Sequence, residues 1–167
     1  MYIVFDFETT GINMMNHYRE PQRAIQLAWH IFDKEYKTIC TKNFYISGHE
    51  QINTDFHKDL NIEFLNTNGT HIVTVLNEFM NDLDFIKSHN GTIIAHNINF
   101  DISVLNNELN INNITSSLST DLLNYVMNPI NHYCTMKETT NLCKLPNPRF
   151  ATQYKYPKLS ELYYFLF

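Results

Sequence analysis

The sequence predicts a single α/β domain of 167 residues, in which helices flank a mixed sheet of about five strands. Three observations carry this prediction. An apolar, strand-like run opens the chain, two further strand-like runs follow as a hairpin, and helical periodicity then alternates with a short buried strand. The length suits one domain, and a hydrophobic fraction of 44% is enough for a sizeable core.

The first part of the chain predicts three strands. Residues 1–10 (MYIVFDFETT) are apolar on both faces apart from two acids, which is typical of a central strand. Residues 11–22 read as a polar loop. Residues 23–33 and 37–47 are strand-like runs joined by a short polar turn, and this arrangement favours a hairpin.

Two helices are expected next, each with a candidate capping residue. Asp59 is expected to cap a short helix that ends near residues 66–69, and Thr70 to cap a longer one. In the longer helix, apolar residues recur at intervals of three and four and so share one face. These residues are Ile72, Leu76, Phe79, Leu83 and Ile86.

The remainder of the chain contains one short buried strand and several helices. Residues 91–96 (GTIIAH) predict the strand, and residues 100–109 predict the helix that follows it. Further helices are expected at 121–128 and 135–143. After a loop with three prolines, a last helix is expected at 158–167.

Composition restricts the class of protein. A net charge of -5 argues against a basic face that grips long duplexes, but it allows a metal-loaded acidic pocket to hold one phosphodiester. No apolar run approaches the roughly 20 residues that span a bilayer, and the N-terminus does not resemble a signal peptide. We therefore expect an intracellular protein of the cytoplasm or nucleus, without membrane contact. Cys40, Cys134 and Cys143 are expected to be reduced core thiols, and the Asn-, Ile- and Tyr-rich composition favours an AT-rich genome such as that of a virus.

Two acids interrupt the first strand. Because residues i and i+2 of a strand point to the same face, Asp6 and Glu8 are expected to lie side by side, with Phe5 and Phe7 on the other face. Like charges at this distance repel, and partial burial adds a desolvation cost. A divalent cation between the carboxylates would offset both the repulsion and the desolvation cost. The alternative is that the pair belongs to the solvent face of the strand.

A third acid follows the short strand. In AHNINFD (residues 95–101), the strand runs into an Asn-rich turn, and Asp101 falls in the first turn of the next helix. An acid at that position is also stabilised by the helix dipole, and Asn97 or Asn99 could serve only as a cap. Taken alone, this segment therefore leaves a structural role open.

Together the two motifs resemble a known family. FDFETTG on a first strand, followed about 90 residues later by AHNINFD, is similar to the DEDDh-type (DnaQ-like) 3′→5′ exonucleases of the ribonuclease H-like superfamily. IQLAW (residues 25–29) resembles the family's second strand. Residues 134–146 and 157–167 resemble the segments that lead to its last motif, so the resemblance covers nearly the whole chain.

The resemblance implies catalysis by two metal ions. Two Mg²⁺ or Mn²⁺ ions would activate a water molecule and stabilise the leaving 3′ oxygen of a phosphodiester. By this resemblance Asp6 would bridge both ions, Glu8 would bind the ion that holds the water, and Asp101 would hold the second ion, mainly through water.

The resemblance also implies residues around the substrate. Thr9, Thr10 and Gly11 would line the terminal nucleotide. His96 and Asn97 would support Asp101 from the turn, and a substrate contact by His96 stays open as the minor alternative.

One part of the family pattern is missing from this sequence. The family ends with a His and, five residues later, an Asp, and none of the eight histidines occupies that place. The C-terminal helix is therefore expected to be incomplete. A truncated reading frame, a fragment, or a subunit completed by a partner chain or a second copy covering the aromatic C-terminal face would each account for it.

Two functions follow as expectations. The first is a metal-dependent 3′→5′ exonuclease that removes nucleotides from the 3′ ends of single-stranded DNA or RNA. The second is a truncated or degenerate exonuclease fold that binds nucleic acid ends or a partner without cleaving.

Overall fold

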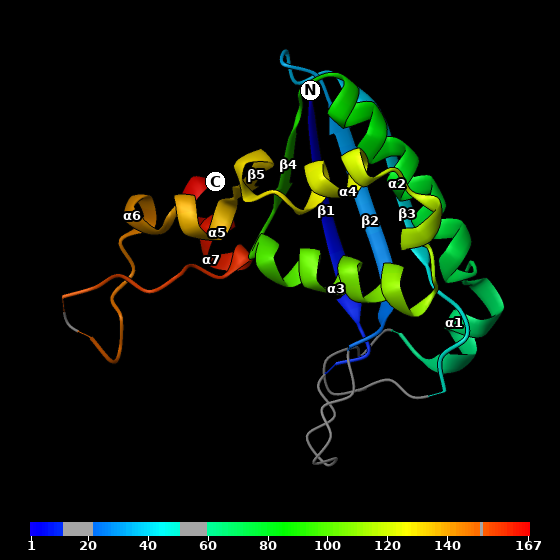
Figure 1. Cartoon of the computed structure of the whole chain (residues 1–167). Helices are drawn as coiled ribbons and strands as arrows, with labels where there is room; N and C mark the ends of the chain where they lie inside the picture. The colour runs from blue at the N-terminus through cyan, green and yellow to red at the C-terminus, as the bar shows by residue number, and fades with distance from the viewer. Residues whose placement is uncertain (12–21, 51–59, 151) are drawn as a thin grey trace.

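The computed structural model describes residues 1–11, 22–50, 60–150 and 152–167. Five strands form one mixed sheet in the order β3-β2-β1-β4-β5 (Figure 1). The strands are β1 (Tyr2–Thr9), β2 (Ala24–Phe32), β3 (Thr38–Tyr45), β4 (Thr92–Ala95) and β5 (His132–Cys134). The helices are α1 (Ile62–Asn68), α2 (Ile72–Ser88), α3 (Ile98–Ile111), α4 (Thr120–Met127), α5 (Thr135–Glu138), α6 (Thr140–Cys143) and α7 (Leu159–Leu166), with 3₁₀ turns at Thr115–Ser117 and Pro129–Asn131.

The central strand and the hairpin are confirmed. β1 pairs with β2 in antiparallel register, with Asp6 opposite Ala28 and Glu8 opposite Gln26. On its other side β1 pairs with β4 in parallel, but only at Tyr2 to Val4. The C-terminal half of β1 therefore extends beyond the end of β4.

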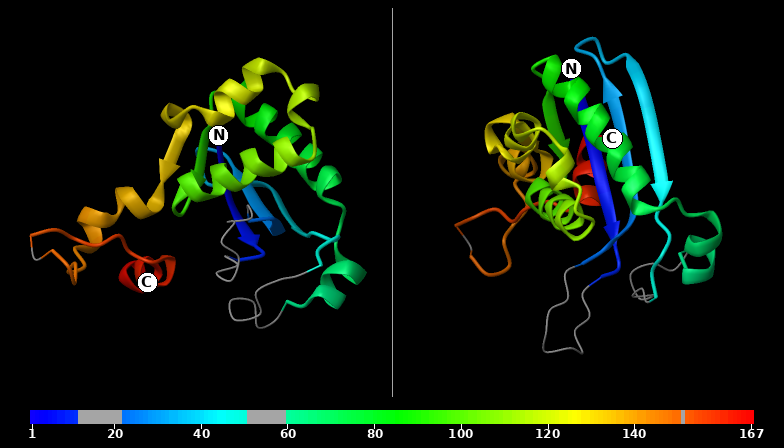
Figure 2. Two further views of the ribbon diagram at one scale, coloured as in Figure 1. Left: turned by 60° about the horizontal axis from the view of Figure 1, so that its bottom comes forward. Right: turned by 45° about the vertical axis from the view of Figure 1, so that its right-hand side comes forward.

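The core lies on one face of the sheet, under α2, α3 and α4 (Figure 2). Phe5 and Phe7 of β1 contact Phe79 of α2 with ring centroids 5.2 and 6.4 Å apart, and Trp29 of β2 contacts the same ring at 5.1 Å. All five apolar residues predicted for one face of α2 are buried. The opposite face of β1, β2 and β3 carries the polar residues of the alternating pattern.

Two helix caps differ from the sequence prediction. α2 is capped by His71 and not by Thr70, since the His71 ring nitrogen Nδ1 accepts a hydrogen bond from the Val73 N–H at 3.3 Å. Asn61 caps α1 through Oδ1, which accepts the Phe64 N–H at 2.8 Å. Asp59, the predicted cap, lies outside the described residues.

The structure differs from the sequence prediction in two elements after α4. Strand β5 has only three residues and pairs in parallel with β4, so that Cys134 lies opposite Ala95. The helix expected over 135–143 is divided at Thr139 into α5 and α6. All three cysteines are free thiols, and Cys134 and Cys143 are buried.

The last helix exposes most of its apolar residues. Of the face expected to be apolar, Leu162 is buried, whereas Leu159, Tyr163 and Leu166 are each more than half exposed. A partner chain or a second copy that covers this face stays a prediction. Within the described part of the chain, no helix is both long enough and apolar enough to cross a membrane.

Candidate active site

Strand β1 places two of the predicted site residues. Asp6 and Glu8 are exposed on one face of the strand, while Phe5 and Phe7 are buried on the other. Desolvation raises the pKa of Asp6, the neighbouring Glu8 raises it further, and the charge of His96 opposes both. This end of β1 therefore concentrates negative charge that is only partly solvated.

Asp101 reaches the same strand from α3. Because Phe7 lies past the last residue that pairs with β4, its N–H has no strand partner on that side. The Oδ1 atom of Asp101 accepts this N–H at 3.1 Å. Its side chain thus continues the sheet's hydrogen bonding at a point where the neighbouring strand has ended, and this bond fixes the carboxylate beside Asp6 and Glu8.

The other oxygen of Asp101 has no partner. Asp101 is 1% exposed, and its Oδ2 atom is buried without a hydrogen bond. Burial raises the pKa of this carboxyl to about 7, against the lowering effect of the Phe7 N–H, and the charges of Asp6 and Glu8 raise it too. A buried carboxylate oxygen in this state requires a proton or a cation.

The donor set fits a hard divalent cation, because carboxylate oxygens are the ligands that Mg²⁺ and Mn²⁺ prefer. The unpartnered Oδ2 of Asp101 is available to ligate, and Asp6 is close enough to raise its pKa. Among the described residues, however, no three His, Cys, Asp or Glu side chains stand at metal-holding distance from one another. The acids are gathered in one place but do not form a closed coordination shell.

Two of the residues expected to line the terminal nucleotide, Thr9 and Thr10, also join the end of β1 to the start of β2. The Thr9 hydroxyl donates to Oε1 of Gln22 at 3.3 Å. Thr10 donates its N–H to the carbonyl oxygen of Arg23 at 2.8 Å, and its hydroxyl oxygen accepts the Arg23 N–H at 3.2 Å. Gly11 follows with a φ of 81°, a left-handed conformation that favours glycine.

The turn after β4 connects the acids to the C-terminal elements. The His96 ring contacts the Thr135 hydroxyl through Nδ1 at 3.0 Å and the Pro157 carbonyl oxygen through Nε2 at 3.1 Å. Asn97 occupies the N-cap position of α3 with a φ of 68°, but its side chain makes no capping bond. Both ring nitrogens of His96 thus hold C-terminal elements, one at the first residue of α5 and the other in the segment before α7.

We expect His96→Ala to lower the free energy of unfolding by about 1 to 3 kcal/mol, because two partly buried hydrogen bonds are lost. The same variant should keep any stabilisation that Mn²⁺ gives the wild type, since the ring binds structural partners. Chemical denaturation with and without Mn²⁺ measures both. His89→Ala is the control, because that ring is exposed. Equal stability of the His96 variant and wild type would contradict this assignment.

Sequence reasoning missed one buried charge near the site. Glu108 of α3 is fully buried and accepts Arg23 Nε at 2.8 Å, an Arg23 Nη at 3.1 Å and the Ala24 N–H at 2.8 Å. The sequence did contain a pattern that indicates burial of Glu108. Glu108 stands seven residues after Asp101, and the buried residues Leu105 and Leu109 fall on the same face at helical spacing.

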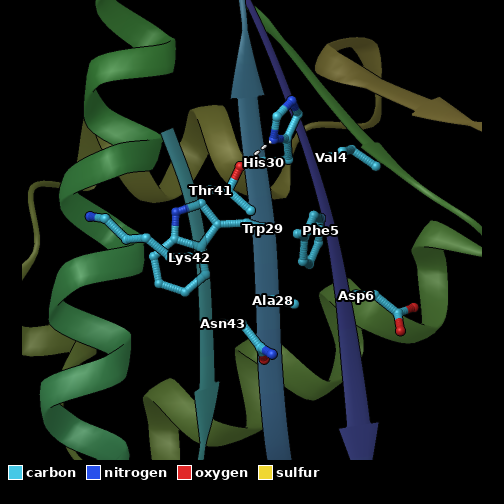
Figure 3. Close-up of a pocket in the computed structure, with 9 residues that line it drawn as sticks. All are labelled: Val4, Phe5, Asp6, Ala28, Trp29, His30, Thr41, Lys42 and Asn43. Atoms are coloured by element: carbon cyan, nitrogen blue, oxygen red, sulfur yellow. Dashed lines mark hydrogen bonds between the residues drawn. The ribbon is translucent and has the colours of Figure 1, made fainter. Parts of the chain in front are cut away.

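A pocket lies beside Asp6 on the face of the sheet opposite the helices. It has a volume of about 400 Å³ and is lined by residues of β1, β2 and β3 (Figure 3). His30 in its wall contacts the Thr41 hydroxyl through Nδ1 at 2.6 Å. Figure 3 shows the carboxylate of Asp6 at the side of the pocket away from Lys42.

Comparison with known proteins gives one family and one fold. A family model described as an exonuclease matches residues 3–157. Exonuclease I of E. coli in complex with a dT13 oligonucleotide is 15% identical with a TM-score of 0.66, covering 89% of this chain and 32% of that one. A product-bound exonuclease I is 15% identical with a TM-score of 0.66, covering 89% and 34%.

A third solved structure is more distant. It is the yeast NOT1 MIF4G domain co-crystallized with CAF1, at 16% identity and a TM-score of 0.56, with 86% of this chain and 62% of that one covered. At these identities the likeness concerns the fold, and the chain spans about a third of the exonuclease I chains. No curated protein gives a significant match.

Proposed function

Because the chain belongs to the exonuclease family, whose model matches residues 3–157, we propose that it is a metal-dependent 3′→5′ exonuclease for single-stranded ends of DNA or RNA. The observation that carries the proposal is the buried, unpartnered Oδ2 of Asp101 beside Asp6 and Glu8. Such an arrangement is costly in a fold and is accounted for by a cation.

In this proposal the three acids hold two Mg²⁺ or Mn²⁺ ions. When bound, such ions lower the pKa of a coordinated water and stabilise the leaving oxygen. The contribution of the chain is to orient the carboxylates. Asp6 and Glu8 are held by the pairing of β1 with β2, and Asp101 is held by the Phe7 N–H.

The residues beside the acids would position the substrate. Thr9 and Thr10 fix the end of β1 against the residues that lead into β2, and the terminal nucleotide would lie along this backbone and that of Gly11. Asn97 is exposed next to the first turn of α3, where the N-terminal end of a helix favours an anionic phosphate.

Two observations favour a second function, a fold that binds ends without cleaving them. The described residues contain no set of three ligands at metal-holding distance. His96, whose charge acts on Asp6, has both ring nitrogens in hydrogen bonds and so is poorly placed as a general base.

The test uses a 5′-labelled single-stranded oligonucleotide with Mn²⁺ or with EDTA. We expect a ladder of products shortened one nucleotide at a time from the 3′ end, absent with EDTA and absent when the 3′ end is blocked. Asp6→Asn, purified in the same way, should give no products. Asp121→Asn is the control, because that acid is exposed in the first turn of α4.

Three outcomes contradict the proposal. Internal cuts in the blocked oligonucleotide would indicate an endonuclease. Equal activity of Asp6→Asn would place the chemistry elsewhere. Binding of ends without any products, in Mn²⁺ or Mg²⁺, would favour the second function.

A further inference from the structure

Residues 144–150 and 152–158, here named the arm, form a hairpin-like segment between α6 and α7. Two backbone hydrogen bonds join its sides, from the Lys155 N–H to the Leu145 carbonyl oxygen at 3.0 Å and from the Asn147 N–H to the Gln153 carbonyl oxygen at 3.3 Å. In Figures 1 and 2 the arm extends away from the sheet and its helices. None of the proposed site residues lies within it.

The charge of the arm is opposite to that of the rest of the chain. The arm holds four basic residues and no Asp or Glu, so that the remaining residues carry a net charge of -9. The four are Lys144, Arg149, Lys155 and Lys158. A cationic segment on an acidic protein favours an anionic partner over a second copy of the same acidic surface.

The arm also exposes aromatic rings. The exposed fraction is 58% for Phe150, 47% for Tyr154 and 58% for Tyr156. Between the two tyrosines, the Lys155 ammonium pairs with the Glu161 carboxylate of α7 at 2.5 Å and is half-buried. Lys155 thus anchors the arm to α7, while the flanking rings remain accessible. The bases of a single-stranded nucleic acid stack on exposed aromatic rings, and its phosphates pair with the cations between those rings.

The base of the arm contacts the turn that leads to Asp101. The Pro157 carbonyl oxygen contacts His96 Nε2 at 3.1 Å, and His96 stands between β4 and α3, five residues before Asp101. The arm is therefore joined to the segment that carries one of the proposed site acids.

We propose that the arm binds single-stranded nucleic acid, with bases stacked on Tyr154, Tyr156 and Phe150 and phosphates paired with Arg149 and Lys144. The proposal rests on the proposed function, because the bound strand is the one whose 3′ end lies at the acids. We expect no strong sequence preference, since every base has a flat face that can stack on a ring. Duplex offers no accessible base faces and binds more weakly.

The test measures binding and not cleavage. Fluorescence anisotropy with a labelled 15-nucleotide oligothymidylate is recorded in EDTA for the whole chain. We expect the double variant Tyr154→Ala, Tyr156→Ala to weaken binding about tenfold or more, from the usual contribution of a stacked base. In the double variant Lys144→Gln, Arg149→Gln, the slope of log affinity against log salt should decrease by about 1.4, or about 0.7 per phosphate contact.

Matched controls come from the turn between β2 and β3. Tyr36 is 83% exposed with a φ of 61°, and Tyr36→Asn removes an exposed ring while tolerating that conformation. Lys34→Gln removes an exposed cation. Both controls should bind the oligonucleotide as wild type does.

Each other outcome overturns the proposal. Arm variants that bind as tightly as the controls exclude the arm. Variants that change the molar mass in light scattering but not the affinity identify it as a protein contact, and equal affinity for duplex excludes stacking. Failure of the catalytic proposal can be distinguished from failure of the arm proposal. Asp101→Asn should abolish cleavage but keep oligonucleotide binding. The tyrosine double variant should weaken oligonucleotide binding but keep any stabilisation by Mn²⁺.

Discussion

Asp101→Asn is expected to stabilise the metal-free protein by up to about 4 kcal/mol above pH 7 and to remove its stabilisation by divalent cations. The carboxyl of Asp101 is buried with an unpartnered oxygen, and its pKa is raised from 3.8 to about 7. Asparagine keeps an oxygen that can accept the Phe7 N–H and has no charge to desolvate. The variant therefore loses the cost of the buried charge together with the ligand.

The pH dependence has a definite sign. Between pH 4 and 7 the folded state retains a proton on Asp101 that the unfolded chain has released. The contribution of Asp101 to the free energy of unfolding of the wild type therefore falls as pH rises through this range and levels off above it. The difference between variant and wild type should be small near pH 4 and largest at pH 8. Divalent cations compete with that proton, so their stabilising effect on the wild type should increase from pH 6 to pH 8.

Urea denaturation at pH 4.5, 6 and 8, in EDTA and in Mn²⁺, measures these quantities. The control is Asp121→Asn, because Asp121 also lies in the first turn of a helix but is exposed and paired with Lys87. It should change stability by less than about 1 kcal/mol at any of these pH values. A constant difference between the Asp101 variant and wild type across pH would contradict a raised pKa. A wild type that does not respond to Mn²⁺ would contradict the metal site.

The sequence alone predicts a feature correctly where the feature depends on the residue pattern within a single helix or strand. The alternation in β1 predicts which face Asp6 and Glu8 share, and the spacing of three and four predicts the buried face of α2. The position of Asp101 in a first helical turn is likewise local. These features depend on residues within one helix or one strand, so they can be predicted before any tertiary contact is known.

What could not be predicted depends on distant partners. The bond from Phe7 to Asp101 spans 94 residues, and the bonds from Arg23 to Glu108 span 85. Strand β5 has only three residues. It is defined by its pairing with β4, because so short a segment carries little strand pattern in its own sequence. The alternative that Asn97 serves only as a cap is not seen, because Asn97 occupies the N-cap position with a left-handed backbone and its side chain makes no capping bond.

Glu108→Ala is expected to lower the free energy of unfolding by about 3 to 5 kcal/mol, because the charged hydrogen bonds of a buried carboxylate are lost. The carboxylate is fully buried and accepts four hydrogen bonds, from two Arg23 nitrogens, the Ala24 N–H and the Asn112 amide. Alanine leaves the Ala24 N–H buried without this partner and deprives the Arg23 guanidinium of its counter-charge.

The consequence extends to the proposed site. Arg23 also pairs through its backbone with Thr10, so Glu108 fixes the start of β2 against the end of β1. We therefore expect Glu108→Ala to weaken Mn²⁺ binding as well as the fold, although Glu108 is not a proposed ligand. Calorimetry with Mn²⁺, at a temperature where the variant is folded by circular dichroism, separates the two effects.

A double-mutant cycle with Arg23→Ala apportions the loss. Arg23 is about one-third exposed, so its own removal leaves a buried carboxylate that still accepts from Ala24 and Asn112. Because the two side chains contact each other, the double variant should be less destabilised than the sum of the single variants, by about 1 to 3 kcal/mol. Additive losses would show that Glu108 acts through the Ala24 N–H and not through the ion pair. A loss below about 1 kcal/mol for Glu108→Ala would mean that β2 is held to α3 by its apolar contacts alone.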